Sequence, residues 1–301
     1  MFRSIKNKNS FYVLGVSGGP DSMFLLDKMR KLKYKLIVAH VNYKKRNTSD
    51  YDEKIVSDYC NKFKINFFSL NPKNYEKGNF QSLARKIRYD FFFSVANNFS
   101  TKNIVIAHNF EDSLETYQLQ LKRKSLFKCW GLQFVSFQKE YFIFRPILSF
   151  KKNEIFKYLK NNKIHYGIDE TNYSLIYERN VVRKKIFSLS DSEKNDMMNE
   201  IIKKNKDLDL INNELKNKSI NLINKNILYL NNEWVSASLE IKKRLIYNWV
   251  NDCSEGKFLQ RKKSILTEII KQLSSKKNEI IINIGENFRI KKKRNIAFIE
   301  I

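Results

Sequence analysis

Residues 17–22 combine side chains and backbone groups that suit the binding of a phosphate. The segment consists of Ser17, Gly18, Gly19, Pro20, Asp21 and Ser22. It follows an apolar run at 11–16 that predicts a buried strand, and it precedes a helical pattern at 23–29. Glycines at such a junction allow positive φ and a close approach of the backbone to a ligand. The N–H groups of the first helical turn would then face an anion, and the two serine hydroxyls can donate as well.

Asp21 is an unusual neighbour for a phosphate unless a divalent cation such as Mg2+ lies between the two. The segment is not a Walker A loop, because the Gly-Lys-Ser/Thr ending is missing. It resembles the PP-loop of the ATP pyrophosphatases instead. This resemblance implies cleavage of ATP between the α and β phosphates and activation of a substrate by adenylation. An ordinary turn between a strand and a helix, with Asp21 near the N-cap, is the alternative.

A second group of polar residues follows a later apolar run. His108, Glu111, Asp112 and Glu115 lie at the start of a helix expected at 111–123. Glu111 and Glu115 are one turn apart and share a helix face. Carboxylates that converge near an ATP site suit Mg2+ binding or general-base catalysis. The alternative is a helix start whose acidic residues complement the helix dipole.

Two pairs of arginines have the spacing of neighbours on a helix. Arg85 and Arg88 are three residues apart, and Arg179 and Arg183 are four apart. Guanidinium groups in such pairs can bind a phosphate or an RNA backbone. A solvated helix face, capped in the second case by residues 169–172, is the alternative.

Strand and helix patterns alternate through the first half of the chain. Strands are expected at 11–16, 35–41, 65–70, 104–107 and 141–144, and helices at 51–63, 80–98, 111–123 and 151–161. Such alternation predicts an α/β fold with a doubly wound, mainly parallel sheet. Ligands bind at the carboxyl ends of the strands in these sheets. Residues 17–22, His40 and His108 are expected at that edge.

The pattern changes after about residue 188, and three parts are predicted. Residues 1–188 form a PP-loop ATP-binding catalytic domain, 189–218 a charged helical linker, and 219–301 a small α/β accessory domain. Helices at 237–251 and 258–274 and strands at 279–284 and 295–300 are expected in the last part.

The chain is strongly basic. It has 57 Lys plus Arg against 31 Asp plus Glu in 301 residues, which gives a formal net charge of +26. Such an excess suits a polyanionic partner, most simply a nucleic acid. The alternative is a compositional bias, since Lys, Asn, Ile and Phe are abundant, as in proteins from AT-rich genomes.

The cysteines and the apolar runs argue against several other classes. Cys60, Cys129 and Cys253 are far apart and form no Cys-x-x-Cys pair, so a disulfide scaffold, a zinc site and an iron–sulfur site are poorly supported. No apolar run reaches the ~18 residues of a membrane span. The short stretch before the first strand leaves no room for a signal peptide. A reduced, cytoplasmic setting is therefore expected.

Taken together, these blocks resemble the tRNA(Ile)-lysidine synthetase family, a branch of the PP-loop ATP pyrophosphatases, from Val13 to Ile186. The matching segments are residues 17–22, 39–42, 84–89, 108–116, 145–148 and 169–183. The last of these, with Asp-x-Thr-Asn and Arg-Asn-x-x-Arg, is more specific than the PP-loop. Residues 219–301 match only in outline, as a short version of the family's tRNA-binding tail.

This resemblance implies a ligase that uses ATP and Mg2+. ATP adenylates the C2 oxygen of the wobble cytidine, C34, in tRNA(Ile) with a CAU anticodon, and pyrophosphate leaves. The ε-amine of free L-lysine then attacks C2 and displaces AMP, and the product, lysidine, changes decoding from AUG to AUA. The amine must be neutral to attack although its free pKa is about 10.4, so a nearby carboxylate base would help. The family also implies a homodimer.

The resemblance also implies roles for the matching residues. Residues 17–22 would bind the β and γ phosphates, with Asp21 reaching them through Mg2+, and His40 and Val41 would lie near the adenosine. The catalytic candidates are Asp21, His108, Glu111 and Asp112, and the candidates for contact with tRNA or substrate are Arg85, Arg88, Glu115, Arg179, Asn180 and Arg183.

The chain departs from the family at three places. Glu111 stands where Asp is usual, Gln81 stands where Glu is common, and residues 123–126 replace a glycine-rich Arg-Gly-Ser-Gly segment. A thiolation enzyme of the same superfamily is a rival, although the cysteines it would need are missing from paired positions. A non-catalytic tRNA-binding protein with a decayed PP-loop is the alternative from another class.

Overall fold

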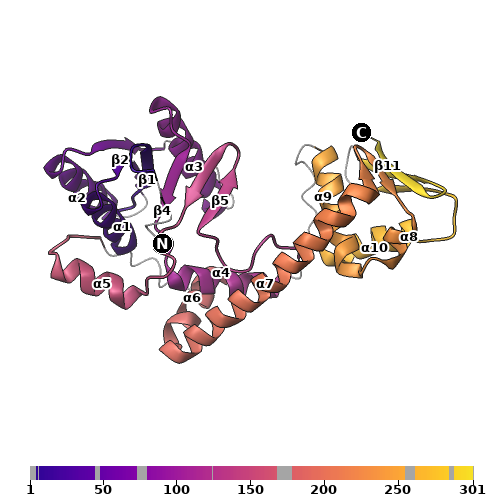
Figure 1. Cartoon of the computed structure of the whole chain (residues 1–301). Helices are drawn as coiled ribbons and strands as arrows, with labels where there is room; N and C mark the ends of the chain where they lie inside the picture. The colour runs from indigo at the N-terminus through magenta and orange to yellow at the C-terminus, as the bar shows by residue number, and fades with distance from the viewer. Residues whose placement is uncertain are drawn as a thin grey trace. The chain divides into compact units, whose positions relative to one another are not determined.

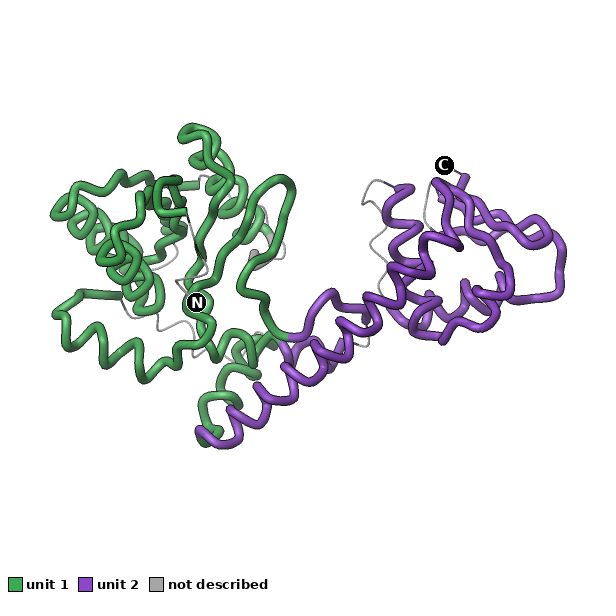
Figure 2. Tube along the Cα trace, viewed as in Figure 1, with its two compact units in different colours: residues 1–116, 131–190 green, residues 117–130, 191–301 purple. Residues whose placement is uncertain are grey.

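The computed structural model describes residues 5, 7–44, 48–72, 80–123, 125–167, 178–254, 262–284 and 288–300. The expected turn at 169–177 and Lys124 lie outside these residues, and the side chain of Gln81 is not among those described. Two compact units make up the chain (Figure 2). Unit 1 comprises residues 1–116 and 131–190, and unit 2 comprises residues 117–130 and 191–301.

Unit 1 is built on a six-stranded sheet with the order β3-β2-β1-β4-β6-β5 (Figure 1). The strands are β1 (Phe11–Gly15), β2 (Lys35–Val41), β3 (Asn66–Leu70), β4 (Asn103–Ile106), β5 (Val135–Gln138) and β6 (Tyr141–Phe144). The helices are α1 (Pro20–Lys31), α2 (Ser49–Lys62), α3 (Phe80–Asn98), the first part of α4 (Phe110–Lys122), α5 (Lys152–Asn161) and α6 (Glu178–Ser188). All strand pairs are parallel except β5–β6, so the predicted doubly wound, mainly parallel sheet is confirmed.

Successive residues of β1 pack into opposite faces of this sheet. Leu14 belongs to the core cluster that includes Met23 and Phe24 of α1, whereas Val13 belongs to the cluster that includes Phe92 of α3. Because side chains alternate between the two faces of a strand, a strand covered on both sides needs apolar residues throughout. The carboxyl end of β1, where the PP-loop begins, is thereby fixed in the middle of the unit.

The sequence does not predict β5, which pairs antiparallel with β6. This strand has only four residues, and Phe137 is 65% exposed. A short strand at the edge of a sheet buries little apolar area, so it leaves no clear periodicity in the sequence.

Asp27 joins three helices of unit 1. It is 2% exposed and accepts hydrogen bonds from Tyr59 of α2 and Tyr158 of α5, both at 2.6 Å. Arg30 and Lys31 pair with the same carboxylate at 2.7 and 3.2 Å. Burial alone would raise the pKa of Asp27, but these hydrogen bonds and charges lower it to about 2. Asp27 therefore stays ionised and holds α2 and α5 against α1.

Replacing Asp27 with asparagine should lower the free energy of unfolding by about 2 kcal/mol at pH 7, because the lowered pKa of Asp27 stabilises the folded state. This stabilisation is complete above the unfolded-state pKa of about 3.9 and is lost as the pH falls through the folded-state value of about 2. Urea unfolding of both proteins at several acidic and neutral pH values measures the difference. A difference that does not shrink in acid would show that the charge of Asp27 is not its source.

Unit 2 contains a five-stranded antiparallel sheet with the order β7-β8-β11-β10-β9. The strands are β7 (Ile223–Asn224), β8 (Ile227–Tyr229), β9 (Glu279–Asn283), β10 (Arg289–Lys293) and β11 (Ile296–Glu300), and the helices are α7 (Asp191–Leu222), α8 (Asn232–Ser236), α9 (Leu239–Cys253) and α10 (Lys263–Leu273). The strands β7, β8 and β10 are additional to the prediction. The boundaries and the tRNA-binding role of the accessory domain stay predictions.

The long helix α7 is not exposed along its whole length, although its charged sequence predicts an exposed linker. Its buried residues are Ile201, Leu208, Leu215 and Leu222. They recur at every seventh position, which keeps them on one face of the helix. Among the described residues, neither α7 nor any other helix has an apolar stretch long enough to cross a membrane.

Candidate functional site

The turn between β1 and α1 contains Ser17, Gly18 and Gly19, the first residues of the segment for which phosphate binding is predicted. Gly18 has a φ of +85°, and Gly19 is the N-cap of α1 and has no side chain to bond the first turn. Pro20 follows at the start of the helix, where no N–H is needed. The N–H groups of Asp21 and Ser22 therefore lack a side-chain cap at a helix N-terminus, which favours a bound anion.

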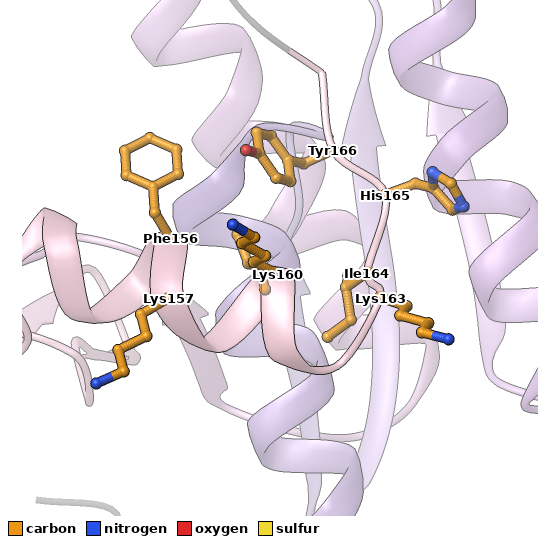
Figure 3. A pocket seen from close by; sticks show the side chains of 8 residues that line it. Phe156, Lys157, Lys160, Lys163, Ile164, His165 and Tyr166 are labelled. Carbon is orange, nitrogen blue, oxygen red and sulfur yellow. The ribbon is translucent and has the colours of Figure 1, made fainter.

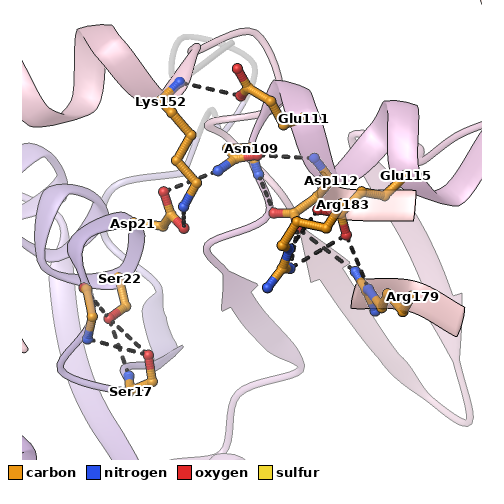
Figure 4. Close-up of polar contacts among 11 residues, drawn as sticks. Ser17, Asp21, Ser22, Asn109, Glu111, Asp112, Glu115, Lys152, Arg179 and Arg183 are labelled. Carbon is orange, nitrogen blue, oxygen red and sulfur yellow. Dashed lines mark hydrogen bonds and ion pairs between the residues drawn. The ribbon is translucent and has the colours of Figure 1, made fainter. Parts of the chain in front are cut away.

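Ser22 holds the loop in this shape (Figure 4). Its hydroxyl donates to the carbonyl of Gly19 at 2.9 Å and accepts from the N–H of Ser17 at 3.2 Å. The hydroxyl oxygens of Ser17 and Ser22 are 3.3 Å apart. Ser22 is buried and Ser17 is exposed, so Ser17 carries the hydroxyl that can reach a ligand.

Gly18 cannot be replaced without moving α2. A Cβ atom at Gly18 would lie 2.9 Å from the backbone oxygen of Asp52, in the first turn of α2. The positive φ would add strain for any other residue. The carbonyl of Gly18 also accepts a hydrogen bond from the N–H of Gly167 at 2.9 Å. The loop is thus held between α2 and the segment that follows α5.

The carboxylate of Asp21 meets residues from α5 and from the start of α4 (Figure 4). It accepts a hydrogen bond from Nδ2 of Asn109 at 3.0 Å and pairs with Nζ of Lys152 at 2.5 Å. Burial raises the pKa of Asp21, and the charge of Asp112 adds to this, while Lys152 and Asn109 oppose it. The carboxylate therefore faces both a cation and a second carboxylate.

Asn109 and Asp112 cap the start of α4 reciprocally. Oδ2 of Asp112 accepts from the N–H of Asn109 at 2.9 Å, and Oδ1 of Asn109 accepts from the N–H of Asp112 at 3.0 Å. Asn109 is completely buried. Because its amide also bonds Asp21, one side chain fixes the position of Asp21 relative to Asp112.

Glu111 contacts the start of α5. It is 4% exposed, and its Oε2 accepts from the backbone N–H of Lys152 at 3.2 Å. This bond satisfies an N–H group that a helix start leaves without an intrahelical partner. Glu111 thus positions the residue whose ammonium meets Asp21, and its predicted catalytic role stays a prediction.

Glu115 pairs with both arginines of α6. Its side chain is 3% exposed and lies 2.7 Å from Nε of Arg183 and 3.1 Å from Nε of Arg179. Both arginines also lie 3.7 Å from Oδ1 of Asp112. Burial opposes the charge of Arg183, but Glu115, Asp112 and Asp21 raise its pKa overall. Arg179 is 40% exposed, so it is the member of the pair with more surface for a ligand.

His108 is held as a neutral imidazole. Nε of Arg145 donates to its Nδ1 at 3.1 Å. Burial lowers the pKa of His108 well below its usual value, and the charges of Arg145, Arg179, Arg85 and Arg88 lower it further. Because Nδ1 accepts a hydrogen bond, the proton of the ring is assigned to Nε2. The ring is therefore suited to donate to an oxygen atom rather than to accept a proton.

Arg85 and Arg88 are exposed on α3. The guanidinium of Arg85 lies 4.7 Å from the ring centroid of Tyr89. No carboxylate of the described residues pairs with either arginine. The positive charges of both arginines lower the pKa of His108, which precedes α4.

His40 supports the loop from within the core. It is 2% exposed, and its Nδ1 lies 2.8 Å from the carbonyl oxygen of Val16. Burial lowers the pKa of His40, so the neutral ring donates from Nδ1 to this carbonyl. Val41 ends β2 and packs partly buried against the core cluster on the α3 face.

Known proteins are similar in sequence to this chain, both in the part that contains the PP-loop and over the rest of its length. The sequence profile of the PP-loop domain matches residues 2–190. A tRNA(Ile)-lysidine synthase from Mycoplasma mycoides subsp. mycoides SC is 38% identical over 296 residues, which cover 95% of this chain and 72% of that protein. The chain belongs to the tRNA(Ile)-lysidine synthase family. A member from Mesoplasma florum is 39% identical over 301 residues, which cover 98% of this chain and 75% of the relative.

A solved structure agrees with the fold of this lysidine synthase family member. The U34-tRNA thiolase NcsA from Methanococcus maripaludis, solved with its [4Fe-4S] cluster, superposes with a TM-score of 0.55. The match covers 68% of this chain and 74% of that chain at 16% identity. At such low identity the likeness shows the PP-loop fold alone. The PP-loop domain binds ATP, which is consistent with the uncapped start of α1.

The structure of this family member brings most of the predicted residues to one edge of the sheet. The residues joined there by hydrogen bonds, ion pairs or electrostatic effects are Asp21, His108, Glu111, Asp112, Glu115, Arg179 and Arg183. Asn180 is partly buried on α6 between the two arginines. Sequence reasoning gave no role to Asn109, Lys152 or Arg145. Asn109 and Arg145 lie in segments that carry the family resemblance, at 108–116 and 145–148, so that signal could have found them. Lys152 has no such signal, because it is one lysine among many in the chain.

Proposed function

We propose that this chain ligates free L-lysine to C2 of C34 in tRNA(Ile) with a CAU anticodon. The proposal rests on three features that meet in a lysidine synthase family member: the uncapped start of α1, Asp21, and a cluster of acidic and basic side chains. This cluster, the acid–arginine network, consists of Asp112 and Glu115 of α4 and Arg179 and Arg183 of α6. ATP is consumed to AMP and pyrophosphate. The lysidine formed changes the decoding of the tRNA from AUG to AUA.

The chain's own groups support the adenylation step in three ways. The N–H groups of Asp21 and Ser22 donate to phosphate oxygens at the start of α1, and the hydroxyl of Ser17 adds a third donor. The C2 oxygen of the cytidine attacks the α phosphate, and pyrophosphate leaves with both electrons of the broken bond. The helix N-terminus and Lys152 stabilise the negative charge on the leaving pyrophosphate.

Asp21 would hold a Mg2+ ion together with phosphate oxygens of ATP, since its carboxylate lies in the first turn of α1, beside the expected phosphate site. Mg2+ in nucleotide sites keeps several waters and uses one or two carboxylates. No group of three acidic, histidine or cysteine side chains suited to a metal occurs among the described residues. Phosphate and water oxygens would therefore complete the coordination, and the ion would neutralise phosphate charge.

The acid–arginine network suits the second substrate, free lysine. Its ε-amine must lose a proton before it attacks C2 and displaces AMP. Asp112 is our candidate for the base, because its Oδ1 faces Arg179 and Arg183, which can hold the carboxylate of free lysine beside it, whereas Glu111 binds the backbone of Lys152. Arg179 can meet the carboxylate of free lysine or a phosphate of the adenylate.

Replacing Lys152 with methionine should raise the KM for ATP by about tenfold, because a charge-assisted contact to phosphate contributes roughly 1.5 kcal/mol or more. Lys102→Met is the matched control, since Lys102 pairs at 2.7 Å with the exposed Glu140 on the surface of the same unit. Pyrophosphate release at increasing ATP concentration measures both variants. An unchanged KM for ATP would leave Lys152 as a structural partner of Asp21 only.

The experiment that tests the function measures incorporation of radiolabelled lysine into a tRNA(Ile) transcript with a CAU anticodon, in the presence of ATP and Mg2+. A transcript with U in place of C34 is the control. Incorporation that requires C34 would establish reaction, substrate and amine donor together. Pyrophosphate release without lysine incorporation would point to another nucleophile, and the absence of both would favour a non-catalytic tRNA-binding protein.

The cysteines give no support to thiolation, the rival reaction. Cys60 is completely buried in unit 1, and burial raises the pKa of its thiol to about 12. Cys129 and Cys253 belong to unit 2, whereas the PP-loop belongs to unit 1. A thiol with a raised pKa is a poor nucleophile and a poor sulfur carrier.

The homodimer implied by the family is a further proposal, and the molar mass in solution tests it.

A further inference from the structure

An open groove of about 660 Å³ lies along the second half of α5 and the loop that follows it (Figure 3). Three of the residues that line it are the lysines Lys157, Lys160 and Lys163, and two are the aromatic residues Phe156 and Tyr166. No acidic residue lines it. The function proposed above uses none of these side chains.

The three lysines of the groove are exposed and form no ion pair with the described residues. Some other exposed lysines of unit 1 do form such pairs, and Lys139, for example, lies 3.2 Å from Asp90. Cations that share one surface without acidic partners create a positive potential that attracts a polyanion. The groove is therefore complementary in charge to a phosphate backbone.

The aromatic residues give the groove a second property. Phe156 is 40% exposed, and its ring centroid lies 5.8 Å from that of Tyr166. Figure 3 shows Lys160 extending toward Tyr166, whereas Lys157 and Lys163 extend on either side. Exposed rings beside cations are the usual platform for the bases of a nucleic acid strand, because every base can stack on them. A free phosphate would need only the cations.

The groove segment is tied to the PP-loop at both ends. Lys152, at the start of α5, pairs with Asp21, and the N–H of Gly167 donates to the carbonyl of Gly18 at 2.9 Å. Lys160 lies eight residues after Lys152 on the same helix, a distance of about 12 Å along the axis. A stacked nucleic acid strand covers that distance in three to four nucleotides at about 3.4 Å each.

We propose that this groove binds the sugar–phosphate backbone of the tRNA strand beside the nucleotide that is modified. The inference rests on the proposed function, which supplies the tRNA. Lys157, Lys160 and Lys163 neutralise phosphates, and Phe156 stacks on a base. Residues 152–167 also contact Asp21 and Gly18 of the PP-loop. One continuous segment therefore positions both the tRNA strand and ATP.

The test compares two triple variants of the full chain. Lys157, Lys160 and Lys163 are replaced by glutamine in the groove variant. Lys33, Lys54 and Lys64, which are exposed in unit 1 outside the groove, are replaced by glutamine in the control variant. Binding of the tRNA(Ile) transcript is followed by fluorescence anisotropy at several salt concentrations, without ATP or lysine. Thermal unfolding checks that both variants fold, and Lys160→Gln alone is a milder second variant.

The groove variant should bind tRNA about tenfold more weakly than the control, and its salt slope should fall by about two, since each lost phosphate contact reduces the slope by about 0.7 to 0.9. The KM for tRNA should rise while the KM for ATP stays unchanged. Equal binding by the two variants would overturn the inference, and so would a loss confined to activity. Failure of the unaltered protein to bind tRNA or to incorporate lysine would instead overturn the proposed function.

Discussion

Replacing Asp21 with asparagine should lower lysine incorporation by at least about 100-fold. Asparagine has the same shape and keeps an oxygen for the amide of Asn109, but it lacks the charge that holds Lys152 and suits Mg2+. Single-turnover incorporation of labelled lysine at saturating ATP measures the loss. Burial raises the pKa of Asp21, so the ionised form is less favoured in the folded than in the unfolded state. The variant should therefore be at least as stable as the unaltered protein at pH 7.

Asp58→Asn is the matched control, because Asp58 is exposed on α2. It removes the same charge from the same unit and should leave incorporation unchanged. Full activity of Asp21→Asn would remove this residue from the mechanism. A clear fall in stability would show that Asp21 acts by holding α4 and α5 in place.

Replacing Glu115 with glutamine should lower the free energy of unfolding by about 3 kcal/mol, because it removes the buried charge that pairs with the largely buried Arg183 and with Arg179. Urea unfolding at pH 7 measures this change. Asp112 stays 3.7 Å from both arginines and compensates only in part. A structural role of this size would explain loss of activity without any contact between Glu115 and a substrate.

Glu140→Gln provides the comparison for Glu115. Glu140 also pairs with a cation at 2.7 Å, Nζ of Lys102, but its side chain is 66% exposed. Exposed ion pairs contribute roughly 0.2 to 1 kcal/mol, so this variant should change little. Equal effects of the two substitutions would mean that burial of Glu115 does not strengthen its pairing. Lost lysine incorporation at unchanged stability would instead support the predicted substrate contact of Glu115.

The parallel core of unit 1 could be predicted because its strands are covered on both faces and therefore form continuous apolar runs. The strand β10 could not, since its sequence Arg-Ile-Lys-Lys-Lys carries four cations. Only Ile290 and Lys292 of this strand are buried, and Lys292 donates from Nζ to the carbonyl of Ser275 at 2.6 Å. That bond depends on tertiary structure, which local sequence does not encode.

The candidate site was predictable where its residues follow strands and was not where distant segments meet. Residues 17–22 and His108 follow β1 and β4, so the parallel sheet brings them to the same edge. Lys152 is 131 positions away from Asp21, and only the packing of α5 against α1 brings the two together. The pairing of Glu115 with the two arginines of α6 is equally non-local. The sequence therefore predicted a ligand contact for each of these residues but not the ion pairs that they form with one another.

The backbone of Gly18 has a consequence for the gene. Any side chain at this position would collide with Asp52 and would strain a φ of +85°. Every change in the first two bases of a glycine codon introduces a side chain or a stop, so nearly all coding changes at this codon should be selected against. The chain has only eight glycines, and its composition resembles that of AT-rich genomes, where mutation pressure removes the two guanines of the codon. The frequency of amino-acid changes at the Gly18 codon in a population, compared with that at other codons, would therefore indicate how strongly selection maintains this loop.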